Sequence, residues 1–300
     1  MTIATPRPGL GLSLAITGAA AFSGKAIIVK LAYRHGTDPM TLLMLRMLLA
    51  LPLFMLMAWW GGRGKPPLTR RQAWGVLGLG FCGYYLASYL DFWGLQYISA
   101  SLERLILYLN PTLVAVLGWL LHRKRLSAQQ ALGMAISYAG IVLVFGHEWQ
   151  AQGAHAMLGA VLVFGSASAY AVYLLYSGRM LQHLGALRLV GLASTVASVF
   201  CFIQFALLRP WSDAWVGPEV LGLSLLNATV CTVLPVLLVM MAIERLGPVL
   251  AAQAGMIGPM CTLLLGALLL DEPLTLWVLS GTALVLAGVT WATRPSRSAN

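Results

Sequence analysis

Long apolar stretches follow one another along almost the whole chain, and they constrain its fold more than any other feature of the sequence. An α-helix needs about 20 predominantly apolar residues to cross roughly 30 Å of hydrocarbon. Stretches near this length, separated by short polar turns, cover residues 10–33, 39–60, 73–95, 99–121, 128–146, 156–178, 185–208, 219–243, 247–270 and 275–293. Strands of a membrane barrel would alternate apolar and polar residues, and these stretches do not. The sequence therefore predicts an all-α integral membrane protein with ten transmembrane helices.

Composition agrees with a chain that lies in lipid. Of the 300 residues, 59% are hydrophobic and 9% are charged, whereas a soluble domain carries about 25% charged residues. The four cysteines fall within apolar stretches and lack the spacing of metal ligands. We therefore expect small buried thiols at these positions, with no metal and no other cofactor.

Basic side chains gather in the short loops on one side of the predicted bundle. They lie in the loop 61–72 and at Arg123–Arg125, whereas the opposite side carries Asp38, Asp271 and Glu272. Basic loops stay in the cytoplasm, so the pattern predicts a multi-pass protein of the inner membrane with both termini cytoplasmic. This orientation also accounts for the excess of 19 basic over 9 acidic residues without a nucleic-acid partner.

An internal repeat relates the two halves of the chain. The stretch Pro111–Leu121 aligns with Pro259–Leu269 at an offset of 148 residues, and the same offset pairs Gly133 with Gly281 and Gly140 with Gly288. Each repeat, 1–146 and 147–300, then holds five helices. Because five is odd, the second repeat enters the membrane from the other side. Inverted repeats around a site near the midplane are a common transporter architecture.

Three stretches carry further motifs. They are Asp38–Arg46, Leu95–Gly140 with Pro111 inside it, and Gly247–Gly288 with Asp271-Glu272-Pro273 inside it. Together they resemble the drug/metabolite transporter superfamily, specifically its EamA-type ten-helix branch. The first repeat departs from the family pattern, because it has Arg123-Lys124 where the family usually shows Gly-Glu; the second keeps Glu272. The resemblance implies a carrier of small metabolites, and the aromatic content and length are most similar to the aromatic amino acid exporters of the YddG type.

Ionisable residues inside transmembrane helices are costly and therefore indicate function. The ammonium of Lys25 either faces a cavity and binds a substrate carboxylate or extends outward to the interface, and both readings stay open. We interpret Arg46 as structural. Asp91 and Glu103 flank a short turn, where we expect them to meet water, with contact to a substrate amino group as the alternative. No carboxylate is then expected at mid-depth, which disfavours coupling to protons through a buried acid.

Polar and aromatic side chains at mid-span form the predicted substrate site. Aromatic rings with polar tips suit a planar zwitterion, although interhelical packing is an alternative for each residue taken singly. The predicted substrate-binding residues are Lys25, Tyr84, Tyr85, Tyr108, Asn110, Tyr173, Asn227 and Gln253. Pro111 and Pro259 are predicted hinges, because proline removes a backbone donor and can kink a helix.

These observations predict a transporter that exports small metabolites, amino acids including aromatic ones, by alternating access and without a buried proton-coupling carboxylate. One alternative is an exporter of cationic drugs or of another metabolite, such as a sugar or nucleotide precursor. A second is a membrane-embedded lipid enzyme, which would need clustered His, Asp or Glu for acid–base or metal chemistry. No such cluster is evident in the sequence, so we expect no catalytic residues, and the expected partners are a small-molecule substrate and the lipid bilayer.

Overall fold

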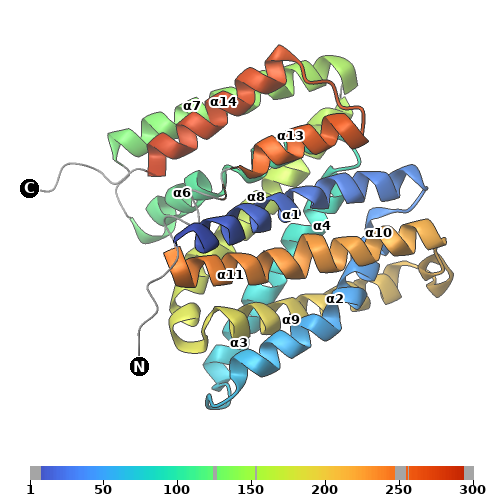
Figure 1. Cartoon of the computed structure of the whole chain (residues 1–300), viewed down its shortest axis with the longest axis vertical. Helices are drawn as coiled ribbons and strands as arrows, with labels where there is room; N and C mark the ends of the chain where they lie inside the picture. Colours follow the sequence, from blue (N-terminus) through green and yellow to red (C-terminus); the bar gives the residue numbers. More distant parts are fainter. Residues whose placement is uncertain (1–7, 124–126, 153, 247–254, 256, 294–300) are drawn as a thin grey trace, which may run out of the picture.

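The computed structural model describes residues 8–123, 127–152, 154–246, 255 and 257–293, and all regular structure within them is helical. In chain order the elements are α1 (Pro8–Arg34), α2 (Pro39–Gly62), α3 (Arg70–Leu79), the π-helix η1 (Gly80–Leu86), α4 (Ala87–Gly94), α5 (Ala100–Leu107), α6 (Asn110–His122), α7 (Ala128–Gln152), α8 (Ala154–Leu184), α9 (Ala186–Leu208), the 3₁₀ turn η2 (Trp211–Ala214), α10 (Pro218–Ala228), the π-helix η3 (Thr229–Val233), α11 (Leu234–Leu246), α13 (Gly258–Leu269) and α14 (Leu276–Thr293). The long helices run side by side in one bundle, with the start of α1 and the end of α14 on the same side (Figure 1).

All ten predicted spans are represented in this bundle. Eight helices are long and apolar enough to cross a membrane, with α5 joined to α6 and α10 joined to α11 through η3. The predicted span 73–95 corresponds to α3, η1 and α4, which follow one another without a break. The predicted span 247–270 contains α13, a shorter apolar helix. The predicted all-α fold with ten transmembrane helices in two inverted repeats is confirmed.

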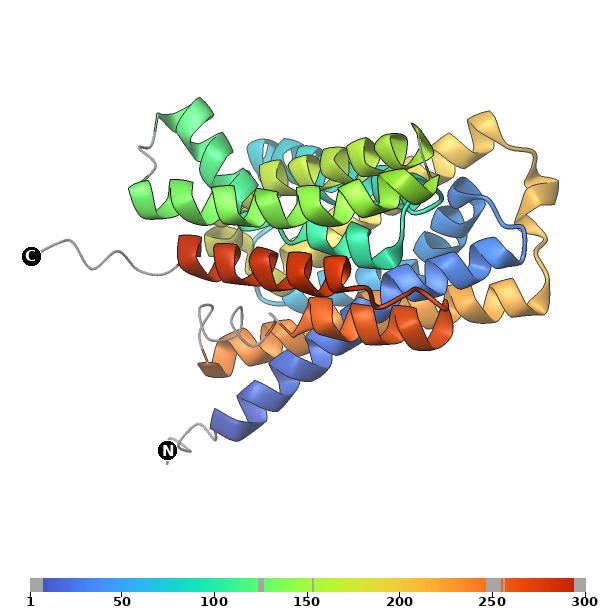
Figure 2. The ribbon, with the colours of Figure 1, turned by 90° about the horizontal axis from the view of Figure 1, so that it is seen from above.

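The helices pair in a pattern that repeats after five spans. The most extensive contacts join α7 to α14 and α2 to α9, so that each pair unites one span with its counterpart in the other half. The contact between α1 and α11 likewise has its counterpart in the contact between α8 and α4. Figures 1 and 2 both show α7 beside α14. Reciprocal pairing of this kind is what a two-fold axis between inverted repeats produces.

The glycines of the sequence repeat lie at the contact between α7 and α14. A Cβ atom added to Gly281 would stand 2.7 Å from the carbonyl oxygen of Gly140, and one added to Gly288 would stand 2.5 Å from that of Gly133. These two contacts exchange with each other under the 148-residue offset. Small residues let transmembrane helices approach this closely. The repeated glycines therefore permit the close contact between α7 and α14.

Two π-helices interrupt equivalent spans of the two repeats. The first, η1, separates α3 from α4, and the second, η3, separates α10 from α11 at the position that the 148-residue offset predicts. A π-turn inserts one residue into the helical repeat and is frequent at functional sites. Both π-helices face the interior cavity described below, because Gly83 and Tyr84 of η1 and Thr232 of η3 line it.

The two predicted hinge prolines each lie in the first turn of a helix. Pro111 is the second residue of α6, directly after the backbone turn that ends α5, and Pro259 is the second residue of α13. Proline is favoured in the first turn of a helix because the N–H that it lacks has no helical partner there. The span that contains Pro111 is discontinuous between α5 and α6, as helices in many transporters are.

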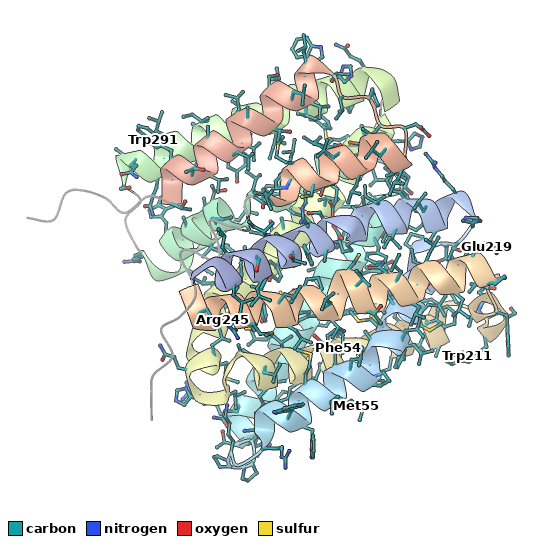
Figure 3. All side chains as sticks on the ribbon, in the orientation of Figure 1. Phe54, Met55, Trp211, Glu219, Arg245 and Trp291 are labelled. Atoms are coloured by element: carbon teal, nitrogen blue, oxygen red, sulfur yellow. The ribbon has the colours of Figure 1, made fainter. Side chains whose placement is uncertain are left out.

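The outer surface of the bundle is apolar, as a lipid-facing surface must be. Along α2, Phe54 points inward and is 1% exposed, whereas its neighbour Met55 points outward and is 55% exposed (Figure 3). Large exposed tryptophans, among them Trp59, Trp211 and Trp291, lie toward the ends of the helices. Such placement matches the aromatic belts at membrane–water interfaces.

Candidate functional site

An interior cavity of about 490 Å³ lies between the two repeats. Its lining comes from α1, α2, η1, α4, α5, α6, α8, α9, η3 and α11. It extends from Lys25 and Asp91 to Leu181 near the end of α8 and Met240 on α11, that is, toward the side on which α1 begins. The volume falls within the usual range for small-molecule sites.

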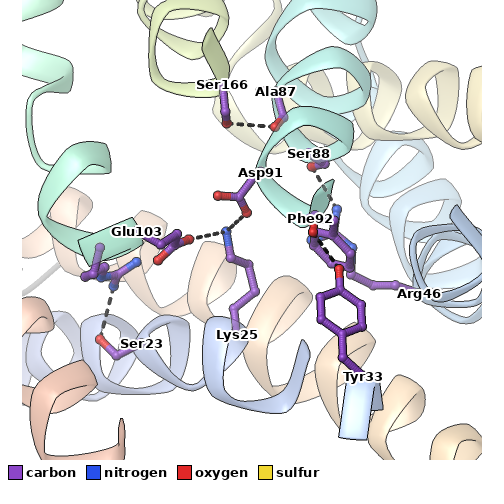
Figure 4. A network of polar contacts seen from close by, with 11 residues as sticks. Ser23, Lys25, Tyr33, Arg46, Ala87, Ser88, Asp91, Phe92, Glu103 and Ser166 are labelled. Carbon is purple, nitrogen blue, oxygen red and sulfur yellow. Dashed lines mark hydrogen bonds and ion pairs between the residues drawn. The ribbon is translucent and has the colours of Figure 1, made fainter. Parts of the chain in front are cut away.

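A cluster of three buried charges, Lys25, Asp91 and Glu103, stands at the inner end of this cavity; we call it the charge cluster. Lys25 Nζ donates a hydrogen bond of 2.6 Å to Asp91 Oδ2 and lies 3.4 Å from Glu103 Oε1 (Figure 4). The three side chains are 8%, 3% and 0% exposed. They come from α1, from the last turn of α4 and from the first turn of α5, so three spans meet at this point.

The charge cluster corrects two predictions made from the sequence. Asp91 and Glu103 were expected to meet water near a turn, and no buried carboxylate was expected; both expectations are wrong, because the two side chains are almost fully buried. The alternative in which Lys25 extends to the interface is also wrong, since its ammonium points into the bundle and pairs with both acids.

Polar contacts on the side away from the start of α1 cover the charge cluster. Lys30 Nζ donates to the carbonyl oxygen of Ile98 over 2.6 Å. The carboxylate of Glu272 accepts hydrogen bonds from the backbone N–H of Ala100 at 2.7 Å and from the hydroxyl of Ser101 at 2.7 Å. These contacts join the end of α1, the start of α5 and the segment after α13. These contacts cover the turn that precedes α5. They explain why Glu103 is buried although it lies only one turn further along the chain.

Arg104 is a functional candidate that reasoning from the sequence missed. Its guanidinium is 5% exposed, lines the cavity and donates to Ser23 Oγ over 3.0 Å. Its Cζ also lies 4.9 Å from the ring centroid of Phe22 and 5.9 Å from that of Tyr108. Within the part of the chain that the structure describes, Arg104 forms no ion pair with a carboxylate. The signal that marks it is a charge inside the predicted span 99–121.

Arg46 also borders the cavity. Its guanidinium donates to Ser88 Oγ over 2.9 Å and lies 4.7 Å above the ring of Phe92 (Figure 4). It is 4% exposed and, like Arg104, makes no ion pair among the described residues. Counting the full charges at this end of the cavity, three cations face two carboxylates. The site is thus electropositive when all of them are ionised.

Tyr84, Tyr170 and Tyr173 form one side of the same cavity, which we call the tyrosine wall. Tyr173 of α8 packs edge-to-face on Tyr84 of η1 at a centroid distance of 5.2 Å and stacks on Tyr170 at 5.4 Å. The hydroxyls of Tyr84 and Tyr173 lie 3.3 Å apart, within hydrogen-bonding distance. All three side chains line the cavity, which therefore offers stacked rings with polar tips.

The structure brings five of the eight predicted substrate-binding residues to the cavity. Those that line it are Lys25, Tyr84, Tyr108, Asn110 and Tyr173. Asn110 Oδ1 has no hydrogen-bond partner among the described residues, whereas Tyr108 donates to the carbonyl oxygen of Gly255 over 2.5 Å.

Two of the remaining three predicted site residues, Tyr85 and Asn227, lie outside the lining. Tyr85 packs against Phe81 and Phe200 instead. Asn227 is fully buried on α10 and lies outside the lining. Gln253 falls outside the residues that the structure describes.

Two inverted five-helix halves around an interior cavity are the architecture of many membrane transporters. The chain belongs to the EamA-like transporter family, whose profile matches it twice, at residues 9–146 and 157–294. The two matches begin 148 positions apart, which is the offset of the sequence repeat.

Several relatives are transporters by name. The chain is 33% identical over 275 residues to the uncharacterized transporter YcbK of Bacillus subtilis, covering 89% of this chain and 87% of that protein. It is 24% identical to the uncharacterized transporter YetK of the same organism, over 93% and 84% of the two chains. A WAT1-related protein of Arabidopsis thaliana is 23% identical, over 89% and 80%. The names of the two Bacillus relatives indicate a transporter rather than an enzyme, and none of the three names supports the narrower resemblance to aromatic amino acid exporters.

A solved crystal structure shares the fold. It superposes with a TM-score of 0.64 over 94% of this chain and 95% of that one, at 19% sequence identity. The agreement extends along nearly the whole bundle and concerns its architecture alone.

Proposed function

We propose that the protein exports small metabolites, amino acids including aromatic ones, by alternating access through the interior cavity. The observation that carries this proposal is the presence, in one cavity, of a guanidinium without a carboxylate partner and a separate wall of tyrosine rings. Arg104 supplies the first, and Tyr84, Tyr170 and Tyr173 supply the second. An amino acid with a planar side chain presents a carboxylate and a ring that fit these two places.

Arg104 replaces Lys25 as the proposed contact for the substrate carboxylate. The ammonium of Lys25 is already held by Asp91 at 2.6 Å, so a second carboxylate would have to displace an existing ion pair. A guanidinium–carboxylate pair at 4 Å gains about 4 kcal/mol of Coulomb energy at an effective dielectric of 20, before desolvation is subtracted. Each aromatic pair adds roughly 0.5–1.5 kcal/mol beyond the burial of its area.

The proposed orientation identifies the side to which the cavity is open in this state. The cavity extends toward the side on which α1 begins and α14 ends, and the basic loops support a cytoplasmic position for that side. Substrate therefore enters from the cytoplasm, while the contacts of Lys30 and Glu272 close the external side. This geometry is one of the two states that alternating access requires, and the inner membrane is the proposed location.

One observation favours a second candidate, an exporter of cationic compounds. Asp91 borders the cavity, and a carboxylate at that place attracts a cationic ligand. However, Lys25 already neutralises this carboxylate at 2.6 Å, whereas the charge of Arg104 has no such partner among the described residues. The balance of charge therefore favours a substrate that carries a carboxylate.

Flux into proteoliposomes tests the proposal. The compounds are phenylalanine, tryptophan and threonine, together with phenethylamine, which has the ring and the amine of phenylalanine without the carboxylate. We expect flux of the three amino acids and little of phenethylamine. Faster flux of phenethylamine than of phenylalanine would support the cationic alternative, and no flux of any amino acid would refute the proposed substrate class.

Substitution at Arg104 tests its assigned role. A hydrogen bond to a charged group contributes about 1.5–3 kcal/mol, so Arg104→Gln should slow flux of all three amino acids by about tenfold or more. Arg245→Gln is the matched control, because Arg245 lies near the end of α11, exposed and bonded only to the carbonyl oxygen of Met241 in the described structure (Figure 3). Equal rates in the two variants would show that Arg104 does not bind the substrate carboxylate.

A further inference from the structure

A second hollow lies on the outer side of the bundle between α3 and α8, continuing along η1; we call it the outer groove. Its volume is about 640 Å³, and none of the described residues lines both this groove and the interior cavity. Two of its lining residues, Trp74 and Tyr176, are 64% and 49% exposed. The outer groove is therefore open to the surroundings of the bundle, which are lipid along these membrane-spanning segments.

Two glycines of α3 keep the outer groove open. Gly75 and Gly78 both line it, one turn apart on the same face of the helix. A Cβ atom added to Gly75 would stand 3.2 Å from Met180 Cε, whereas one added to Gly78 would meet no atom within 4 Å. The space beside Gly78 is thus room that the protein itself does not fill.

The depth of the outer groove matches one leaflet of a bilayer. Its lining extends along the chain from Arg71, in the first turn of α3, to Cys82 in η1, a rise of about 16 Å at 1.5 Å per residue. Half of the hydrocarbon thickness of roughly 30 Å is about the same length. The lining deeper in the membrane is apolar and includes Leu79 and Val172. These dimensions and this chemistry suit an acyl chain.

The end of the outer groove at the membrane surface is basic. Arg71 and His183 line it there, and Lys65 Nζ donates to the carbonyl oxygen of Leu184, which holds the basic loop before α3 against the end of α8. No acidic residue occurs in α2, α3, η1, α8, α9 or the loop 63–69. The positive charge at this end therefore has no acidic partner in the segments that surround it, and the complementary ligand is an anion.

We propose that the outer groove binds an anionic phospholipid, with its phosphate at Arg71 and one acyl chain along α3 and η1. A guanidinium binds phosphate oxygens through two parallel hydrogen bonds. A soluble anion would leave the apolar length of the groove unfilled, and a zwitterionic lipid would bring a second cation to an end that is already basic. The basic loops support a cytoplasmic position for this end, and the cytoplasmic leaflet is the one in which anionic lipids attract basic segments.

Native mass spectrometry of the purified full-length protein tests the headgroup contact by counting bound lipids. The probes are phosphatidylglycerol and phosphatidylcholine with identical acyl chains. We expect the wild type to bind phosphatidylglycerol about fivefold more tightly or better, and Arg71→Gln to lose about this factor. Arg70→Gln is the matched control, because Arg70 is the adjacent basic residue of the same turn and lies outside the lining. Equal binding of the two lipids by the wild type, or equal affinity of the two variants, would overturn the proposal.

Filling the outer groove tests the acyl-chain contact in the same measurement. Gly78→Leu places a side chain in open space, so it should leave the helix contacts intact and reduce bound phosphatidylglycerol at least as much as Arg71→Gln does. Gly222→Leu is its control, because Gly222 is exposed on α10 and its added Cβ atom would also meet nothing within 4 Å. Wild-type binding by Gly78→Leu would overturn the proposal. Inorganic phosphate should leave the bound lipid in place, and displacement by phosphate would assign the site to a soluble anion instead.

Discussion

Replacement of Lys25 by methionine tests whether its charge maintains the fold or serves the substrate. The ammonium is 2.6 Å from Asp91 Oδ2 and 3.4 Å from Glu103 Oε1, and all three side chains are almost fully buried. Its loss leaves two buried carboxylates without an ion-pair partner among the described residues. Breaking a buried ion pair by removing one partner costs about 3–5 kcal/mol. We therefore expect Lys25→Met to lower the free energy of unfolding by about that amount.

Unfolding of the purified protein in detergent micelles by added SDS measures this free energy. The double variant Lys25→Met/Asp91→Asn should regain about 1–3 kcal/mol over the single variant, because one of the stranded charges is removed with the lysine. Lys65→Met is the matched control: its ammonium bonds to a carbonyl oxygen, that of Leu184, and a net hydrogen bond contributes about 0.5–1.5 kcal/mol. Full wild-type stability of Lys25→Met would refute the assignment of the lysine to the ion pairs.

Three further predictions concern the hinge prolines, the contribution of Glu272 to stability and the orientation in the membrane. Pro111→Ala and Pro259→Ala should express at wild-type levels but slow the flux of phenylalanine, because each proline lies in the first turn of a helix and can act as a hinge there; unchanged rates in both variants would mean that the prolines serve packing alone. Glu272→Ala removes a carboxylate that binds the start of α5, so it should lower the free energy of unfolding by about 1.5–3 kcal/mol in the same SDS titration. An unaltered titration would show that Glu272 does not stabilise the covered start of α5. Reporter fusions after Arg71 and near Trp149 should read cytoplasmic and external, and a reversed pair of signals would overturn the orientation.

The architecture could be predicted because it depends on local properties of the sequence. The length of an apolar stretch determines whether it crosses a bilayer, and this property needs no knowledge of neighbours. The repeat could also be recognised in the sequence. Gly133, Gly140, Gly281 and Gly288 pack against one another across the two-fold axis, and the close contact allows only glycine at these positions. The pairing of α7 with α14 therefore determines a pattern of glycines that the sequence shows.

The depth of the charges could not be predicted, because it depends on segments distant in the chain. Glu103 follows the start of α5 by one turn, a position that by itself indicates access to water. It is buried because Glu272, about 170 residues later, and Lys30 cover that turn. Arg104 was overlooked for the same reason: only the fold shows that its guanidinium points along the cavity.

The choice between neighbouring tyrosines also depended on the structure. Adjacent residues of a helix point about 100° apart, so Tyr84 and Tyr85 do not both face one cavity. The π-helix η1 contains both residues and shifts the register on which a count by 3.6 residues relies. The structure turns Tyr84 to the cavity and Tyr85 to Phe81 and Phe200.

This pair of neighbours supplies the most direct measurement of the central claim, that substrates bind in the interior cavity with a ring on the tyrosine wall. The measurement is the ratio of phenylalanine flux to threonine flux in proteoliposomes of Tyr84→Ala and of Tyr85→Ala, at matched expression. Loss of an aromatic contact of roughly 0.5–1.5 kcal/mol should lower the ratio about two- to tenfold in Tyr84→Ala. The ratio should stay at the wild-type value in Tyr85→Ala. An unchanged ratio in Tyr84→Ala, or an equal fall in both variants, would contradict binding at the tyrosine wall.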